Sequence, residues 1–280
     1  MVSATVFAQA VERVLYVSVF DEKTRAPITG LGPDAFSVKE DGVRREVLRV
    51  TPATSPMPVA ILIDNTEGAT KTIADLRKAL AAFLRELDGL GPVALVSVAD
   101  RPTILIDYTT DQKKLQDAAG RVFAVPNSGA TLLDAIVEVG KGLEKREADR
   151  AAMVVVTTEN TEFSTRHDRD VLQALAKSGA MLSAIVFTTP GIMNYRDDPA
   201  RQRASVLDVG PRTSGGTRVD VLTSLAYESR LQQLAALLKS QHRVVYSRPQ
   251  TLIPPERLEV AATKPGQEAA GGPARGQPVR

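Results

Sequence analysis

An aspartate that directly follows an apolar run is the residue of this chain best placed to do chemistry. Residues 59–63 (VAILI) are all apolar, and Asp64, Asn65 and Thr66 come next. If the chain stays extended there, the alternation of side chains points Asp64 and Thr66 to the same side. Carboxylate and hydroxyl oxygens are the ligands that hard cations such as Mg²⁺ and Mn²⁺ prefer. The spacing therefore indicates a candidate ligand or metal site at the end of this run.

Two later loops offer more oxygen atoms. Ser128 to Thr131 (SGAT) precedes a helical pattern, and Thr158 and Glu159 follow another apolar run. Ligand sites in parallel α/β sheets lie beyond the carboxyl ends of the strands, so the three loops are expected to meet at one edge. A simpler alternative exists for Thr131, because with Asp134 it has the spacing of a helix capping box, and N-capping alone would explain it.

Strands that alternate with helices must position these loops. Continuous apolar runs predict buried strands, and apolar residues at helical spacing predict amphipathic helices. Strands are expected at 59–63, 93–98, 103–106, 153–156, 181–187 and 216–221, and helices at 70–87, 111–122, 131–145, 169–177 and 222–238. This order predicts an α/β fold with a doubly wound, mostly parallel sheet. Only residues 99–102 separate the second strand from the third, so one antiparallel edge strand is expected.

Two segments with β character flank the α/β unit. Residues 11–52 alternate between apolar and polar side chains, with a hairpin signal at Asp41-Gly42, and residues 243–263 return to the same character. We expect these segments to pack together as a small β-subdomain. The chain then divides into an N-terminal β segment (11–55), an α/β domain (56–242), a C-terminal β segment (243–263) and a disordered tail (264–280) rich in Gly, Pro and Ala.

Composition excludes several classes of function. The chain has 35 Lys and Arg against 33 Asp and Glu, so a formal charge of +2 argues against a dedicated nucleic-acid binder. The absence of Cys excludes disulfides and thiolate metal sites, and two His cannot form a multi-histidine site. A metal in this protein would therefore have to be bound by oxygen atoms.

The N-terminus points to export. Ala8-Gln9-Ala10 has the small-x-small form of a secretory cleavage site, so residues 1–10 are a candidate signal-peptide remnant. No apolar run approaches the roughly 18 residues that a transmembrane helix needs. We expect a periplasmic or extracellular protein without a transmembrane segment, with a cytoplasmic location as the alternative.

Residues 59–240 resemble a von Willebrand factor type A domain. More narrowly, residues 11–263 resemble the bacterial VWFA-related proteins of the acidobacterial type. The segments that carry this resemblance are VSVFDEKTRAPITGLGPDAFSVKEDGVRREVLRV near the N-terminus, SGAT followed by LLDAI, the Ser214-Gly215-Gly216 step and RVVYSRP near residue 245. The resemblance implies a Rossmann-like type A fold.

The type A family carries a metal-ion-dependent adhesion site written D-x-S-x-S, with a Thr and an Asp on two later loops. By this resemblance, Asp64 matches the first position and Thr131 matches the later Thr. Thr66 stands at the first Ser position and keeps a hydroxyl group. These three residues are the candidate metal ligands, and Mg²⁺ or Mn²⁺ is the candidate cofactor. The alternative is that Asp64 and Thr66 only satisfy backbone groups in a turn.

Two positions of that adhesion site are lost. Gly68 stands at the second Ser position and has no ligand atom, and Thr158 replaces the later Asp, with Glu159 beside it. Fewer ligands and less negative charge predict weak metal binding or none. The candidate ligand-binding residues are thus Asp64, Asn65, Thr66, Gly68, Thr131, Thr158 and Glu159.

Three functions follow from these observations. The resemblance and the scarcity of catalytic groups favour a non-enzymatic protein-binding module of adhesion or scaffold type, whose protein ligand contacts the sheet edge. A metal-dependent phosphoryl-transfer enzyme using Asp64 is the alternative, although Thr66 stands where a second carboxylate would be expected. The third function is that of a structural assembly module, in which the site at Asp64 is inert and the β segments make the assembly contacts.

Overall fold

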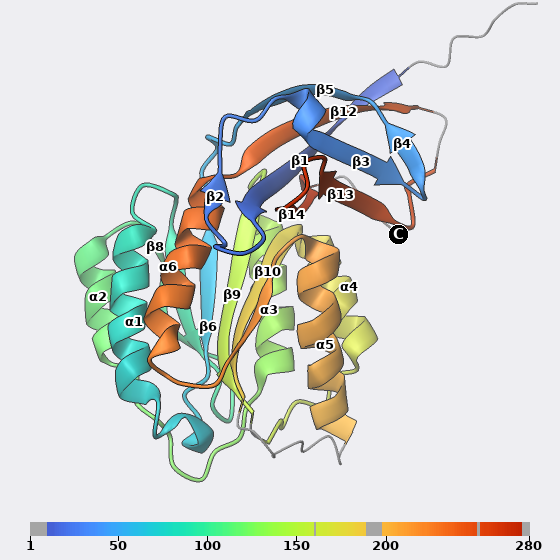
Figure 1. Cartoon of the computed structure of the whole chain (residues 1–280). Coiled ribbons are helices and arrows are strands. Elements are labelled where there is room, and N and C mark those ends of the chain that lie inside the picture. The colour runs from blue at the N-terminus through green and yellow to red at the C-terminus, as the bar shows by residue number, and fades with distance from the viewer. Residues whose placement is uncertain (1–9, 160, 189–197, 251–252, 276–280) are drawn as a thin grey trace, which may run out of the picture.

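Two units stack end to end in this computed structural model, which describes residues 10–159, 161–188, 198–250 and 253–275 (Figure 1). An α/β unit lies below a smaller β unit, and the first and last strands of the described residues, β1 and β14, both belong to the β unit. The candidate signal-peptide remnant at 1–10 lies outside the described residues except for Ala10. No helix of the described ranges has the length and apolar character that crossing a bilayer requires.

A six-stranded sheet forms the centre of the α/β unit. Its order is β11-β10-β9-β6-β7-β8, and only β8 runs antiparallel to its neighbour. The strands are β6 (Val59–Ile63), β7 (Val93–Ser97), β8 (Thr103–Thr109), β9 (Ala151–Thr158), β10 (Ala180–Phe187) and β11 (Arg218–Val221). The four inner strands are buried along nearly their whole length, as expected for a sheet covered on both faces. This confirms the predicted doubly wound sheet with one antiparallel edge strand.

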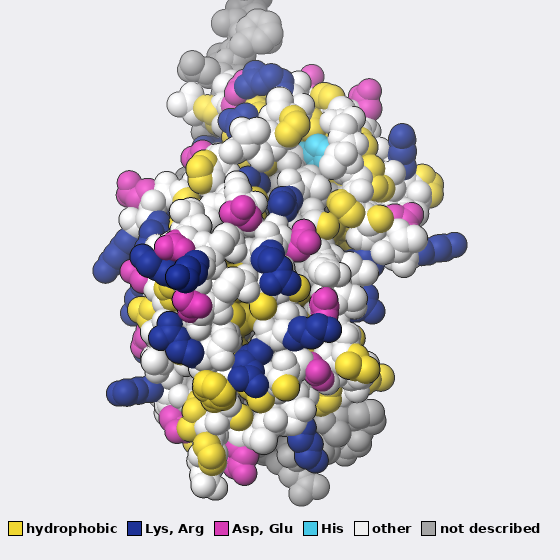
Figure 2. Space-filling model, turned by 90° about the vertical axis from the view of Figure 1, so that its left-hand side faces the viewer, with side chains coloured by type: hydrophobic (Ala, Val, Ile, Leu, Met, Phe, Trp, Pro, Cys, Tyr) yellow, Lys and Arg dark blue, Asp and Glu magenta, His cyan; other side chains and the backbone are white. Residues whose placement is uncertain are grey.

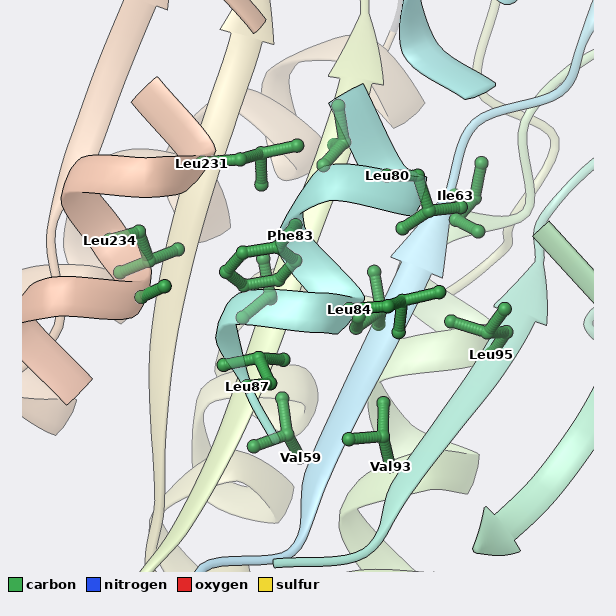
Figure 3. Packing of buried hydrophobic residues seen from close by; sticks show 14 of the residues in the cluster. Val59, Ile63, Leu80, Phe83, Leu84, Leu87, Val93, Leu95, Leu231 and Leu234 are labelled. Carbon is green, nitrogen blue, oxygen red and sulfur yellow. The ribbon is translucent and has the colours of Figure 1, made fainter. Parts of the chain in front are cut away.

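Helices cover both faces of this sheet and define two apolar cores. One face carries α1 (Ile73–Glu86), α2 (Gln112–Gly120) and α6 (Ala226–Lys239), and the other carries α3 (Leu132–Arg146), α4 (Asp168–Ser178) and α5 (Asp198–Ser214). Val59 and Ile63 of β6 pack on the first core, while Leu62 packs on the second. Figure 3 shows the first core, with Phe83 of α1 lying between β6 and Leu234 of α6.

Helix α5 has no counterpart among the elements expected from the sequence. Gly210 and Pro211 lie inside it, and both are poor helix formers, so the local pattern favours a loop. Packing against the sheet overrides this preference. A Cβ on Gly210 would lie 2.8 Å from the Leu182 side chain, so the glycine allows the helix to pack closely on the sheet. The Asp198-Pro199 step, typical of a helix start, was the available signal.

The β unit consists of two small sheets packed over one core. The first has the order β14-β1-β12-β5, with β2 beside β1, and the second has the order β13-β3-β4. The elements are β1 (Ala10–Asp21), β2 (Pro27–Ile28), the 3₁₀ turn η1 (Pro33–Ala35), β3 (Phe36–Glu40), β4 (Val43–Arg45), β5 (Val47–Pro52), β12 (His242–Pro249), β13 (Leu258–Ala262) and β14 (Gln267–Pro273). Pairing of β1 with β12 and of β3 with β13 joins the N- and C-terminal segments.

Two features of the β unit differ from the sequence pattern. The alternating pattern of residues 11–52 runs on through 43–50, yet this stretch divides into β4 and β5, which belong to different sheets. Residues 264–280 were expected to be disordered, yet Gln267–Pro273 form β14, antiparallel to β1. His242, the first residue of β12, is buried, with an exposure of 3%.

Glycines explain why strand β14 forms in a stretch whose composition predicts disorder. A Cβ on Gly271 would lie 2.6 Å from the Tyr16 carbonyl oxygen of β1, and a Cβ on Gly215, after α5, would clash with the backbone of Gly271. Gly215 also has a φ of +81°, which disfavours any other residue. The glycines therefore permit close backbone packing here, although their composition indicates disorder.

Candidate functional site

The Asp64 carboxylate links the ends of two central strands. Asp64 follows β6, and its backbone N–H donates to Val156 of β9 at 2.9 Å. Its Oδ1 accepts hydrogen bonds from the Thr66 N–H (3.1 Å) and hydroxyl (2.6 Å). Its Oδ2 accepts from the Thr157 hydroxyl (2.8 Å) and from the Thr158 N–H (2.9 Å) and hydroxyl (3.1 Å). The side chain of Asp64 is therefore buried and surrounded by donors, with an exposure of 1%.

Arg203 of α5 lies against this carboxylate. Its Nη2 is 3.8 Å from Asp64 Oδ2, and the same nitrogen donates to the Thr157 hydroxyl oxygen and to the Thr158 carbonyl oxygen. Only 5% of Arg203 is exposed. A buried guanidinium thus lies beside Asp64 at the carboxyl edge of the sheet, and it was not among the residues expected from the sequence.

Glu162 is the second carboxylate next to Arg203. Its Oε2 lies 3.7 Å from Arg203 Nε, and its Oε1 accepts from the Ser164 N–H at 3.3 Å. A bridge between Ala130 and Glu162 places it beside the SGAT loop. Burial raises the pKa of the Glu162 carboxyl, and the charge of Arg203 partly opposes that rise. Arg203 therefore lies between two buried carboxyl groups from different loops.

Thr131 occupies the N-cap position of α3, but its side chain does not cap the helix. Its hydroxyl donates to the Val98 carbonyl oxygen at 3.0 Å, which ties the SGAT loop to the end of β7. The hydroxyl oxygen of Ser164 accepts from the Asp134 N–H at 3.1 Å instead. Asp134 itself pairs with Arg166 at 2.7 Å. The capping-box explanation for Thr131 is therefore wrong, since a residue from another loop provides the cap.

The remaining predicted site residues, Asn65, Gly68 and Glu159, lie in the loops around Asp64. The Asn65 side chain donates to the Phe123 carbonyl oxygen and accepts from the Ala99 N–H, both at 3.1 Å. Gly68 is exposed in a short 3₁₀ turn, η2 (Glu67–Ala69). The Glu159 N–H donates to the Phe187 carbonyl oxygen at 3.1 Å. Of the predicted site residues, Thr66 and Thr158 thus donate to the Asp64 carboxylate. The Asn65 side chain and the Thr131 hydroxyl instead bond to backbone atoms of neighbouring segments.

The donor chemistry at Asp64 does not fit a resident divalent cation. A carboxylate offers about four lone-pair directions, and the five hydrogen bonds described above already use them. Arg203 adds a positive charge where a cation would approach. Within the part of the chain that the structure describes, no three Asp, Glu, His or Cys side chains gather in a metal-ligating group.

Exposed apolar side chains surround this buried centre. We call Phe123, Val125, Phe163, Leu222 and Leu225 the apolar rim, since they lie in the loops before α3, after β9 and before α6, at the carboxyl edge of the sheet. Their exposures range from 36% to 78%. Figure 2 shows hydrophobic side chains gathered at this lower end of the molecule.

Two contacts hold the aromatic members of the apolar rim in place. The ring of Phe163 packs on Gly129, where a Cβ would come within 2.6 Å of the ring, and the Phe163 N–H donates to Ala130 of the same loop at 2.6 Å. The Arg77 guanidinium lies 5.0 Å from the centroid of the Phe123 ring. Phe123 and Phe163 are thus exposed and held by neighbouring residues.

Comparison with known proteins identifies the domain. A family model described as von Willebrand factor type A domain matches residues 59–160. A von Willebrand factor type A protein from Catenulispora acidiphila superposes with a TM-score of 0.54 at 11% identity, over 95% of this chain and 74% of the other. BatB from Bacteroides thetaiotaomicron superposes with a TM-score of 0.50 at 17% identity, over 66% of this chain and 100% of the other.

A further likeness is to the human COPII-coat protein Sec24c, with a TM-score of 0.49 at 10% identity, over 79% of this chain and 44% of the other. The chain thus spans less than half the length of that protein. No curated protein matches the sequence at a significant level. The narrower resemblance to the acidobacterial-type proteins stays a prediction. The match at residues 59–160 nonetheless identifies a von Willebrand factor type A domain within the α/β unit, and the similar solved structures share the fold of that unit.

Proposed function

We propose that this chain is a non-enzymatic protein-binding module, of adhesion or scaffold type, that engages its protein ligand at the carboxyl edge of the central sheet. The observation that carries the proposal is the apolar rim, in which Phe123, Phe163 and Leu225 are exposed on three separate loops around one end of the sheet. Clustered exposed apolar side chains mark interaction surfaces, and aromatic anchors contribute much of the affinity at such surfaces.

The chemistry of Asp64 favours binding over catalysis. A nucleophilic or metal-held carboxylate needs an open lone pair and access to substrate. Asp64 is buried, and Thr66, Thr157 and Thr158 donate to both of its oxygens. We therefore assign Asp64 the role of joining β6 to β9 beneath the apolar rim, an arrangement that argues against phosphoryl transfer by this residue.

Quantitative affinity capture tests this proposal. The full chain, immobilised, is incubated with soluble and envelope protein fractions of its source organism, and the retained proteins are measured by mass spectrometry. The test variant is Phe123→Ser with Phe163→Ser, and the control is Val43→Ser, which alters an exposed apolar residue of the β unit. Thermal unfolding of all three proteins establishes that each is folded.

We expect a protein that the wild type and the Val43→Ser control retain about tenfold more strongly than the apolar-rim variant, a difference of about 1.4 kcal/mol. An unchanged set of retained proteins would contradict the proposal. Loss of the retained protein in Val43→Ser alone would instead support the structural assembly module, with the β unit as its contact surface. Export to the periplasm or the extracellular space stays a prediction from the sequence.

A further inference from the structure

Arg203 occupies the centre of a buried polar cluster at the carboxyl edge of the sheet. Its guanidinium lies 3.8 Å from Asp64 and 3.7 Å from Glu162, measured between the nearest nitrogen and oxygen atoms of each pair. It also donates to the hydroxyl oxygen of Thr157 and the carbonyl oxygen of Thr158. One cation therefore neutralises charge and binds oxygen atoms contributed by two loops.

Helix α5 holds Arg203 in this position. Val206, Leu207 and Gly210 follow Arg203 at spacings of three, four and seven residues, and all are buried against the sheet and α4. On the flank of the helix, Ser205 donates to Asp168 of α4 at 2.6 Å. Arg203 therefore lies on the buried stripe of a firmly packed helix, and turning its side chain out to solvent would disrupt that packing.

A guanidinium suits this cluster better than a metal ion does. It carries planar N–H donors that match several oxygen acceptors at once, and it keeps its charge when buried. The neighbouring oxygens belong to one carboxylate saturated with hydrogen bonds, one buried carboxyl group, a hydroxyl and a carbonyl. A divalent ion brought to Asp64 would meet the like charge of Arg203 and would have to displace hydrogen-bond donors.

We propose that Arg203 is the permanent cation of this site, so that this type A domain keeps its sheet edge ordered and the Asp64 charge compensated without a divalent metal. A positive charge remains necessary next to Asp64 and Glu162, but the chain itself supplies it. The hydroxyl groups of Thr66, Thr157 and Thr158 can turn their protons away from Asp64 and offer their oxygens to an ion. Removing the guanidinium while both carboxylates remain should therefore create a divalent-cation site where the wild type has none. This inference concerns the cation alone and is independent of which protein the apolar rim binds.

Metal titration of the full chain tests the proposal. Free Mn²⁺ is followed by its electron paramagnetic resonance signal, and thermal unfolding is recorded with and without Mn²⁺. The test variant is Arg203→Gln, which removes the charge and keeps hydrogen-bonding groups. The matched control is Arg201→Gln on the same helix, where the arginine is exposed and pairs across one turn with Asp198. The double variant Arg203→Gln with Asp64→Asn locates any new site.

Wild type and Arg201→Gln are expected to leave Mn²⁺ free. Arg203→Gln is expected to bind it at least about tenfold more tightly than wild type and to unfold at higher temperature in its presence, with both effects lost in the double variant. A wild-type protein that binds Mn²⁺ in an Asp64-dependent way would overturn the proposal, whether or not Arg203→Gln folds. A folded Arg203→Gln that binds no more tightly than wild type would also overturn it.

Arg203→Lys separates the charge of the side chain from its shape. It keeps the positive charge and should leave Mn²⁺ free, as the wild type does. If a folded Arg203→Lys bound Mn²⁺ as tightly as Arg203→Gln, the charge would not be what excludes the metal, and the proposal would be wrong.

Discussion

The Arg203 guanidinium lies 3.8 Å from the Asp64 carboxylate in a position where neither side chain is more than 7% exposed. The two residues come from elements that the sequence separates widely, the turn after β6 and the second turn of α5. Their pairing places a buried ion pair, whose two members each hydrogen-bond to Thr157 and Thr158, at the carboxyl edge of the central sheet. Under the proposed function, the protein ligand contacts the exposed residues around this pair.

Replacing Asp64 by Asn should destabilise the fold strongly. The change keeps the shape of the side chain but removes one of the two carboxylates that, among the described residues, lie against the buried charge of Arg203. Removing one partner of a buried ion pair typically costs about 3–5 kcal/mol, and urea unfolding of the full chain measures it. Asp107→Asn is the control, because that side chain is 77% exposed and its loss should change stability by less than about 0.5 kcal/mol. Equal stability of the two variants would show that the pair contributes little.

Alanine at Gly271 should cost about 2 kcal/mol of stability through overpacking. The new Cβ would lie 2.6 Å from the Tyr16 carbonyl oxygen and push β14 away from β1. Gly120→Ala is the matched control, since nothing lies within 4 Å of a Cβ there. Hydrogen exchange of the β1 amides that pair with β14 should accelerate in Gly271→Ala alone. Unchanged exchange in that variant would show that β14 does not need close backbone contact.

Stability should fall at mildly acidic pH because of His242. Burial lowers the pKa of this imidazole below its ordinary value of 6.5, so the unfolded chain takes up a proton before the native protein does. The free energy of unfolding is therefore level above pH 6.5 on this account and declines as pH falls from 6.5 through the lower native pKa. His242→Gln should remove this decline, whereas His167→Gln, at an exposed site, should keep it. An identical pH profile for wild type and His242→Gln would contradict this assignment.

Gly129→Ala should weaken partner binding as much as Phe163→Ala does. The new methyl group would occupy the space of the Phe163 ring, so the ring would have to leave its present position in the apolar rim. Both variants should lose about tenfold in affinity for the protein that the capture experiment identifies. Their affinities are measured by titration calorimetry. A Gly129→Ala protein of wild-type affinity would show that the position of the Phe163 ring does not matter.

Patterns that depend on local spacing could be read from the sequence. The apolar run at 59–63 predicted a strand buried on both faces, and β6 has those bounds. Placing Asp64 and Thr66 together followed from the alternation of side chains, and the Thr66 hydroxyl does donate to Asp64 at 2.6 Å. The short separation between β7 and β8 likewise predicted their antiparallel pairing.

Features set by tertiary packing could not be read in this way. Helix α5 contains Gly210 and Pro211, whose local preference opposes a helix, so Arg203 was not placed on any element. An arginine that precedes buried residues by three, four and seven positions is a usable signal, but only once the helix itself is recognised. Strand β14 could not be recognised for a related reason. The glycines that allow its close approach to β1 also give this segment a composition typical of a disordered tail.

The most direct test of a permanently bound arginine cation is anomalous diffraction from crystals of the wild-type protein soaked in Mn²⁺. We expect no anomalous peak next to Asp64 and an Arg203 side chain that still lies against both carboxylates. A peak at a coordination distance of about 2.1 Å from an Asp64 oxygen, with Arg203 displaced, would contradict it.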